Sequence, residues 1–504
     1  MMLKQNVITK AVIVGAGLGG LAAAIRLGAR GYRVTVLDRL PVPGGRATVF
    51  KQDGFTFDAG PTIITAPFVL EELWASAGRN FYDDVKLQAL EPFYTIRFDD
   101  GSTFTNQSDI AAMRQEVARI SPSDVAGYEN FMRESEDIYK VGFEKLGHVP
   151  FGSFSSMLAI APQLLKLKAW RSVHAHVASH VKNPKLRMAL SFHPLFVGGN
   201  PFRATSIYSM IAHLERQFGV HCAMGGTGAI VQAMVRLIEN QGGEVLCNQD
   251  VAEITTAQRR ATGVRLVSGE HLAADIVVSN ACAAHTYNNL LAGGTHQRWT
   301  KRKMAKARHS MSLFVWYFGT DRNFDTVPHH TIVMGPRYRS LIDDIFENKI
   351  LADDMSLYLH RPTATDPSLA PEGCDSFYVL SPVPNQDSGI DWTSMAESYR
   401  QRIAERLDET MMPGFEKHIV TQRIMTPLNF EHDLLSYKGA AFGLEPLLTQ
   451  SAWFRPHNRS EEIENLFLVG AGTHPGAGVP GVISTARVLD SIVPQAKAFT
   501  HARA

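Results

Sequence analysis

The sequence contains few cysteines, and none of them pairs at metal-binding or redox spacing. Its 504 residues include only Cys222, Cys247, Cys282 and Cys374, and no two of them form a CxxC pair. We therefore expect neither a redox dithiol nor a bound metal. Isolated thiols are typical of reduced side chains in a cytosolic protein.

An excess of charge of one sign is also missing, as are long hydrophobic runs. Lysine and arginine total 50, aspartate and glutamate total 49, and the formal net charge is +1. The balance gives no case for a nucleic acid partner. No run reaches the roughly 18 apolar residues of a membrane-spanning helix. Residues 11–25 are glycine- and alanine-rich, which favours a strand, a turn and a helix over a secretory signal.

What the chain does have is a glycine-rich stretch near each end. Residues 11–27 read AVIVGAGLGGLAAAIRL, in which Gly15, Gly17 and Gly20 form GxGxxG between an apolar strand and a helix. The first glycine permits a tight turn, the second lets a pyrophosphate approach the backbone, and the third lets the helix pack on the strand. Asp38 ends the next strand, where a carboxylate accepts from ribose hydroxyls and disfavours a 2′-phosphate.

A second loop after this unit bears on the choice between NAD and FAD. In residues 43–50, PGGRATVF, Gly44 and Gly45 permit a tight turn, and Arg46 can bind a pyrophosphate through two parallel hydrogen bonds. Taken alone, Arg46 can equally be a surface arginine. A nicotinamide enzyme does not need such a loop, whereas the larger flavin nucleotide does, so the loop favours FAD.

The second glycine cluster lies in residues 468–483, LVGAGTHPGAGVPGVI. A strand end followed by a helix would offer backbone amides, and a helix dipole, to the flavin ring as negative charge develops there. Pro480 suits the first turn of that helix. The alternative is a loop that merely closes the domain. We expect the two ends of the chain to hold opposite ends of one FAD.

The motifs along the chain carry a family resemblance. GAGLGGLAAAIRL, PGGRA, GFTFDAGPTIIT, GGNPF, GGTGAIVQAMVRL, TQSAWFRPHNR and NLFLVGAGTHPGAGVPGVI together resemble the bacterial-type phytoene desaturases. These are FAD-dependent carotenoid enzymes of the wider amine-oxidase-like flavoprotein superfamily. The resemblance covers nearly the whole chain in order, and its carboxy-terminal segment is the most specific to the carotenoid branch.

The resemblance implies a set of residues that contact FAD. Two positions depart from the family pattern: Asp38 stands where relatives commonly have Glu, and Thr485 where they commonly have Gly or Ser. Both departures leave the turn glycines intact. The expected contacts are Gly15, Gly17, Gly19, Gly20, Asp38, Arg39, Gly45, Arg46, Pro61, Thr62, Val251, Gly472, Val479, Pro480, Gly481 and Val482.

Length and pattern indicate a discontinuous α/β architecture. The chain is too long for one core. Its α/β pattern is interrupted by a helical pattern over 85–220 and by mixed strands and helices over 290–450. We predict a Rossmann-like FAD-binding domain with an inserted α+β substrate domain and a helical membrane-associating region. The FAD-binding domain would comprise residues 1–84, 221–289 and 455–504, and the substrate-binding domain residues 85–220 and 290–454.

The resemblance also implies a substrate. Successive desaturation of phytoene would give lycopene or neurosporene through carotene intermediates, with oxygen or a membrane quinone as the electron acceptor. At about 0.8 kcal/mol per CH2, moving such a hydrocarbon from lipid into water would cost roughly 30 kcal/mol. We therefore expect a cytoplasmic protein attached peripherally to the cytoplasmic membrane. Residues 151–173 mix apolar side chains with Lys166, Lys168 and Arg171, as in a docking face or, equally, a core helix with a basic rim.

The proton acceptor is left unassigned by the sequence. His329, His330 and His474 are candidates, although such loop and turn histidines are more often solvated or structural. Aromatic residues in 206–210 and 312–319 would line a substrate tunnel or belong to the core. The alternative functions are a carotene isomerase or ketolase on the same scaffold, and a non-enzymatic prenyl-lipid escort.

Overall fold

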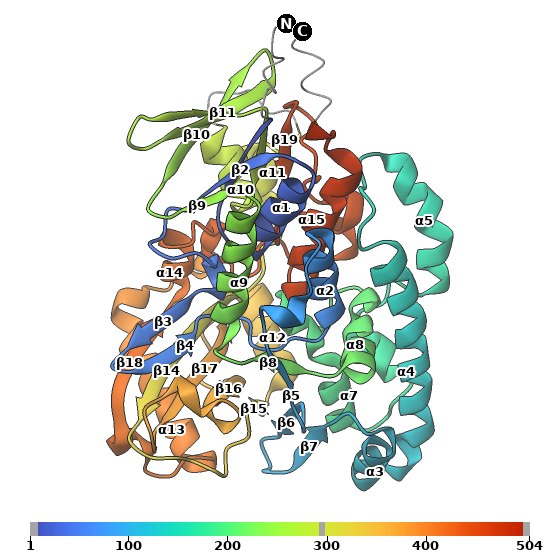
Figure 1. The fold of residues 1–504 in the computed structure, drawn as a ribbon. Helices are drawn as coiled ribbons and strands as arrows, with labels where there is room; N and C mark the ends of the chain where they lie inside the picture. The colour runs from blue at the N-terminus through green and yellow to red at the C-terminus, as the bar shows by residue number, and fades with distance from the viewer. Residues whose placement is uncertain (1–8, 292–297, 497–504) are drawn as a thin grey trace, which may run out of the picture.

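A five-stranded parallel sheet forms the part of the fold that joins the two ends of the chain. The computed structural model describes residues 9–291 and 298–496. The strand order is β19-β13-β1-β2-β9, and all four pairings are parallel. Figure 1 shows the early strands and the last helix side by side. The strands are β1 (Lys10–Val14), β2 (Arg33–Leu37), β9 (Glu244–Leu246), β13 (Ile276–Ser279) and β19 (Leu466–Leu468).

Both faces of this sheet are covered, which explains its continuously apolar strands. Ala11 and Ile13 face a layer of helices, while Val12 and Val14 face the opposite core, because successive side chains in a strand alternate. The first layer contains α1 (Leu18–Ala29), α2 (Pro67–Ser76), α9 (Thr227–Asn240) and α15 (Val479–Ile492). The second includes the antiparallel sheet of β10 (Val251–Ala257), β11 (Arg260–Leu266) and β12 (His271–Ala273).

A second, seven-stranded sheet has the order β18-β14-β17-β16-β15-β6-β7. Its pairings are antiparallel except β15 with β6. The helical pattern expected throughout 85–220 was wrong at its start, because this stretch supplies β6 and β7 to the sheet. The strands are β6 (Tyr94–Arg97), β7 (Thr103–Asn106), β14 (Ser312–Thr320), β15 (His330–Val333), β16 (Leu357–His360), β17 (Asp375–Val383) and β18 (Ile419–Met425).

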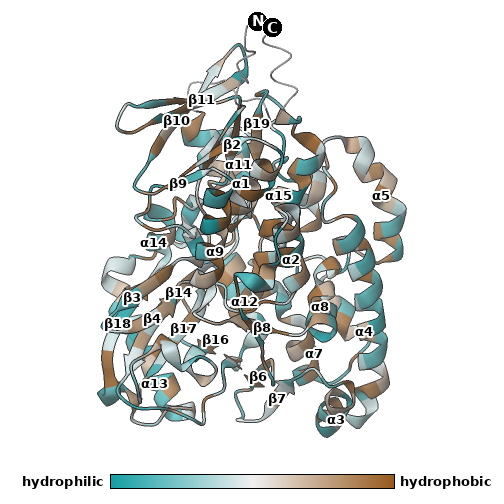
Figure 2. Ribbon diagram, in the orientation of Figure 1, coloured by the Kyte–Doolittle hydropathy of each residue, from teal (hydrophilic) through white to brown (hydrophobic). Residues whose placement is uncertain are grey.

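The helices within residues 110–218 include one with no buried residue. They are α3 (Ile110–Ile120), α4 (Val125–Tyr139), α5 (Phe154–Lys166), α6 (Val173–Ala178), α7 (Pro184–Ser191) and α8 (Met210–Phe218). The reading of 151–173 as a core helix was wrong, since α5 is nowhere fully buried. It lies at the edge of the molecule and carries hydrophobic and hydrophilic residues in turn (Figure 2). None of the helices in the described ranges has the length and apolarity to cross a bilayer.

The remaining elements are short and connect these layers. The helix α13 packs its buried face against Phe314 and neighbouring residues of β14. The elements are β3 (Val49–Gln52), β4 (Phe55–Asp58), β5 (Leu87–Ala89), β8 (His221–Ala223), α10 (Ala283–His285), α11 (Lys301–Lys306), α12 (Tyr338–Asp343), α13 (Trp392–Thr410) and α14 (Pro427–His432).

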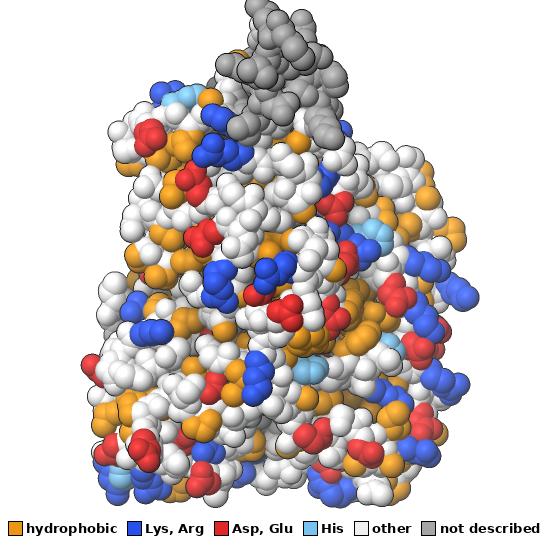
Figure 3. All heavy atoms as spheres, viewed as in Figure 1, with side chains coloured by type: hydrophobic (Ala, Val, Ile, Leu, Met, Phe, Trp, Pro, Cys, Tyr) orange, Lys and Arg blue, Asp and Glu red, His pale blue; other side chains and the backbone are white. Residues whose placement is uncertain are grey.

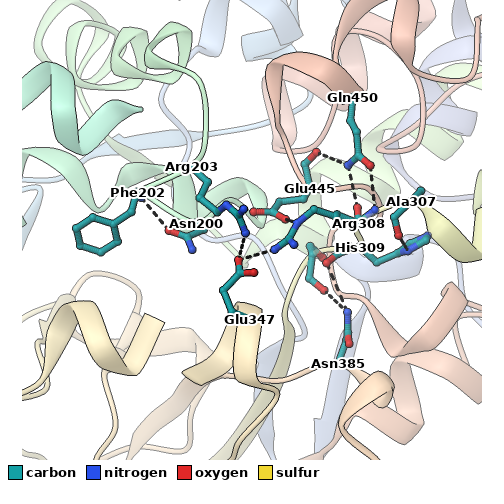
Figure 4. A network of polar contacts seen from close by, with 11 residues as sticks. Asn200, Phe202, Arg203, Ala307, Arg308, His309, Glu347, Asn385, Glu445 and Gln450 are labelled. Carbon is teal, nitrogen blue, oxygen red and sulfur yellow. Dashed lines mark hydrogen bonds and ion pairs between the residues drawn. The ribbon is translucent and has the colours of Figure 1, made fainter. Parts of the chain in front are cut away.

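A polar network beside β14 connects four segments that are distant along the chain, those of Arg203, Arg308, Glu347 and Glu445 (Figure 4). Arg308 donates from Nε to Glu445 Oε2 at 2.9 Å and from Nη2 to Glu347 Oε1 at 2.5 Å. Glu347 also pairs with Arg203. Gln450 exchanges hydrogen bonds with the backbone of Arg308, at 2.9 Å in each direction. The Glu445 side chain is 1% exposed, so Arg308 is the counter-charge of a buried carboxylate.

Candidate cofactor and substrate site

One cavity of about 940 Å³ borders both glycine-rich ends of the chain. It begins at the carboxyl ends of β1, β2 and β13, the edge where ligands bind in open α/β sheets. It continues past the amino end of α15 to one face of the seven-stranded sheet and to α5. Its volume lies at the upper end of the range for ligand pockets. Its first part has polar walls, and its far part is lined mainly by aliphatic and aromatic side chains.

The first glycine cluster brings bare backbone to this cavity. Gly15 has φ +99°, a region that favours glycine, and its N–H donates to Leu37 O at 2.7 Å. Gly17 precedes α1 without a side-chain cap, so the first N–H groups of the helix are free to meet an anion. Gly15, Gly17 and Gly19 line the cavity. Gly20 does not line the cavity. A Cβ at this position would lie 2.0 Å from Gly15 O, so the missing side chain lets α1 pack closely on the turn after β1.

Asp38 and Arg39 line the cavity but are already engaged by protein groups. The Asp38 carboxylate accepts from the backbone N–H of Ala16 at 2.7 Å and of Leu40 at 2.9 Å. Burial raises the pKa of Asp38, and these two hydrogen bonds oppose that rise. Arg39 donates to the carbonyl oxygens of His432 and Asp433 at 2.7 and 2.8 Å. Asp38 therefore keeps acceptor capacity toward the cavity, while Arg39 mainly holds the loop after α14.

Arg46 is a cation without a carboxylate partner among the described residues. Its Nη2 donates to Ser436 Oγ at 2.5 Å, and its Nε is buried with no hydrogen-bond partner. Burial lowers the pKa of Arg46, because desolvation disfavours the charged form. Ser436 Oγ in turn donates to Ala440 O at 2.7 Å. A desolvated guanidinium facing a cavity beside a helix amino terminus fits a bound pyrophosphate.

The second glycine cluster lines the same cavity from the other side. Gly470, Ala471 and residues 478–482 border it, and α15 begins there with Pro480 in its first turn. Gly472 does not line the cavity, because its Cα faces Ala283. A Cβ added at Gly472 would lie 2.9 Å from the Ala283 Cβ. Thr485, which departs from the family pattern, forms two hydrogen bonds through its hydroxyl. The hydroxyl accepts from Gly470 N–H at 2.9 Å and donates to Val482 O at 2.6 Å.

The histidine candidates occupy structural positions. His474 lines the cavity, but its Nε2 lies 2.7 Å from Leu146 O and must donate there. Burial lowers its pKa to about 4. His329 and His330 are buried against His360 rather than solvated, and neither lines the cavity. Their connection to it is indirect, through Tyr358 Oη, which lies 2.7 Å from His330 Nδ1.

Pro61, Thr62 and Val251 line the cavity as expected from the resemblance. Thr62 Oγ1 lies 3.0 Å from Tyr358 Oη and 2.9 Å from Tyr378 Oη. Two tyrosines therefore fix the one threonine hydroxyl. Gly45, Arg46 and residues 479–482 also line the cavity, so Gly20 and Gly472 are the expected contacts that do not.

The far half of the cavity collects apolar side chains from distant segments. In β14, Leu313 and Val315 face the cavity, whereas Phe314 and Trp316 face the core on the other side. The aromatic stretch 312–319 is therefore partly wall and partly core. The apolar lining also includes Phe151, Met157, Ile160, Leu164, Phe192, Leu195, Phe196, Ile207, Met210, Ile211, Met311, Ile332, Met334, Leu357, Leu380 and Met425.

Asn280 and Ser436 are site residues that sequence reasoning missed. Asn280 directly follows β13, and its Nδ2 donates to Gly15 O at 3.3 Å while the residue lines the cavity. Its place after a buried parallel strand is a signal that could have identified it. Ser436 carried no such signal, because only the folded chain brings it to Arg46.

Comparison with known proteins identifies relatives over the whole length of the chain. The family model "Flavin containing amine oxidoreductase" matches residues 18–488. The neurosporene-forming phytoene desaturase of Cereibacter sphaeroides is 52% identical over 492 residues, covering 97% of this chain and 95% of the relative. The lycopene-forming phytoene desaturase of Pseudescherichia vulneris is 50% identical over 487 residues, covering 96% and 99%.

Solved structures agree on the fold. An oxidoreductase from Methanosarcina mazei superposes with a TM-score of 0.63 at 18% identity, covering 96% of this chain and all of that chain. At this identity the likeness establishes the fold alone. The fold, the cavity and the full-length identities together place this chain in the flavin containing amine oxidoreductase family, among the bacterial phytoene desaturases.

Proposed function

We propose that this protein is an FAD-dependent desaturase that introduces double bonds successively into phytoene and forms neurosporene or lycopene. The observation that carries the proposal is the single cavity that joins the glycine clusters and Arg46 to a long apolar wall. A nucleotide needs the first half, and a hydrocarbon needs the second. The proposal also rests on the approximately 50% identity to relatives with this activity.

The FAD-binding domain is proposed to comprise residues 1–84, 221–289 and 455–504, with residues 85–220 and 290–454 forming the substrate domain. Within it, Asp38 would accept from the ribose, and Arg46 with the amino end of α1 would hold the pyrophosphate. The amino end of α15 would face the flavin ring. Asn280 joins the expected contacts.

Oxidised flavin supplies a hydride acceptor, which no side chain provides. The chain's own part is to hold the hydrocarbon in one register, to exclude water and to position groups around the reacting carbons. The aliphatic wall from β14 and α5 would hold the hydrocarbon and exclude water. At the junction of the two halves, the Thr62 hydroxyl is held by Tyr358 and Tyr378, and no base is assigned.

We propose that α5 docks on the cytoplasmic membrane surface and passes substrate into the cavity. Met157, Ile160 and Leu164 line the cavity, while Leu158 and Leu165 on the same helix are 61% and 63% exposed. Hydrophobic side chains reach the surface where α5 lies (Figure 3). Trp170 is 60% exposed, and Lys166 adds a positive charge, a combination typical of interfacial helices.

Replacing the exposed leucines of α5 tests this docking role. The double variant Leu158→Ser/Leu165→Ser should lose at least about tenfold in affinity for anionic liposomes, because two exposed leucines no longer insert. Cosedimentation measures the affinity. The control Val267→Ser/Ile350→Ser removes two hydrophobic residues that are 69% and 52% exposed elsewhere and should bind like the parent. Equal binding by the two double variants would contradict docking through α5.

The activity itself is tested by anaerobic incubation of the FAD-loaded protein with phytoene in liposomes. We expect conversion with an added quinone, or with oxygen when it is readmitted, and absorption bands that move to longer wavelength with each desaturation. A product with an unchanged chromophore length would indicate an isomerase, and added oxygen functions would indicate a ketolase. A protein that binds isoprenoid but retains no FAD would be an escort.

A further inference from the structure

Glu134, His176 and His180 form a cluster at some distance from the cofactor cavity. Glu134 belongs to α4, His176 to α6, and His180 to the turn that follows α6. Glu134 Oε2 lies 3.6 Å from His176 Nε2 and 3.3 Å from His180 Nε2. One ligand atom from each residue lies within 4.8 Å of the others. None of the three lines the cavity described above.

Three ring nitrogens of these two histidines have no hydrogen-bond partner among the described residues. The His176 side chain is fully buried, and neither of its ring nitrogens is hydrogen-bonded. His180 Nε2 is also buried without a hydrogen-bond partner. His176 Nε2 lies 3.6 Å from Glu134 Oε2, beyond hydrogen-bonding distance. Burying these ring nitrogens without hydrogen-bond partners is unfavourable. A ligand bound between them would remove that cost.

Glu134 is suited to bind a cation. Its carboxylate already pairs with one cation, the ammonium group of Lys168. Lys168 Nζ lies 3.1 Å from Oε1 and 3.3 Å from Oε2. The lysine is about one-third exposed and can swing into solvent. Glu134 and His180 are partly exposed, which leaves an entry path.

We propose that Glu134, His176 and His180 bind one Zn²⁺ ion, with water as the fourth ligand. Two imidazoles and a carboxylate are a common zinc ligand set, and the spacing of the three atoms suits ligands about 2.0–2.2 Å from a shared ion. The ion fastens α4 to the segment that follows α5. The expectation of no metal rested on cysteine spacing, and Glu134 is too far along the chain from the histidines to be linked to them by sequence.

Zinc binding is tested on tag-free protein stripped with a chelator and then titrated with ZnSO₄. Elemental analysis after desalting should give one zinc per chain, and zinc should raise Tm by about 5 °C. His180→Gln and Glu134→Gln should lose both effects, whereas His271→Gln, an exposed histidine elsewhere, should keep them. Lys168→Met should bind zinc more tightly, because the competing cation is gone.

The Tm of each variant is measured with and without zinc, and the difference is compared between variants. Changes in the intrinsic stability of a variant therefore cancel. If parent and His180→Gln take up the same amount of zinc, or if Lys168→Met weakens uptake, the site is not where we place it. Neither FAD nor phytoene enters the assay, so the result is independent of the proposed function.

Discussion

Replacing Arg46 by methionine is expected to abolish retention of FAD through purification and to reduce desaturation at least about 30-fold. The guanidinium is the one buried cation that we place against the pyrophosphate, and its Nε has no hydrogen-bond partner among the residues that the structure describes. Losing a desolvated charge partner costs about 2–5 kcal/mol, which corresponds to roughly 30-fold or more in affinity. FAD content from the flavin absorption, together with titration of the apoprotein, measures the effect.

Two further variants separate cofactor binding from folding. Arg46→Lys keeps the charge but loses the planar fork, so we expect intermediate affinity. Arg33→Met removes an exposed arginine of β2 and should retain FAD. The apoprotein of Arg46→Met should unfold at the same Tm as the parent or above it, because an unpaired buried cation has been removed. Full FAD retention by Arg46→Met would contradict the proposed pyrophosphate site.

Replacing Arg308 by methionine should destabilise the fold by about 3–5 kcal/mol, because the buried carboxylate of Glu445 loses its counter-charge. Burial already raises the pKa of Glu445. A buried carboxyl group whose pKa is raised in the folded state destabilises the fold less as the pH falls, because it becomes protonated. The stability loss should therefore be smaller at pH 5 than at pH 8. Thermal and chemical unfolding at both pH values measure it.

The double variant Arg308→Met/Glu445→Gln provides the matched control. With the buried charge removed, most of the lost stability should return. Glu445→Gln alone should cost less than Arg308→Met. If the double variant is as unstable as Arg308→Met, packing of the arginine rather than its charge holds its own segment to those of Glu347 and Glu445.

The part of the cavity wall that we assign to the nucleotide was indicated by the sequence because its signals are local. Gly15, Gly17 and Asp38 act within one strand–helix–strand unit, and their spacing alone places them at one sheet edge. Pro480 likewise occupies the first turn of the predicted helix. These elements depend on backbone geometry that a short stretch specifies by itself.

The parts that could not be predicted depend on partners far along the chain. β6 is a short strand whose parallel partner is β15, so its local pattern did not distinguish it from the helices that follow. His330 is buried because His360 and Tyr358 of the adjacent strand enclose it. Ser436 reaches Arg46 only in the folded chain. Such pairings arise from tertiary contacts, which override local propensity.

The position of β19 and α15 late in the chain has a consequence during translation. β19 supplies an edge of the parallel sheet, and α15 packs on α1. Until these elements have left the ribosome, the side of α1 that packs on α15 stays uncovered in the nascent polypeptide, and exposed hydrophobic surface of this kind favours aggregation. We therefore expect a chain that stalls before residue 479 to aggregate more readily than a chain in which α15 is in place.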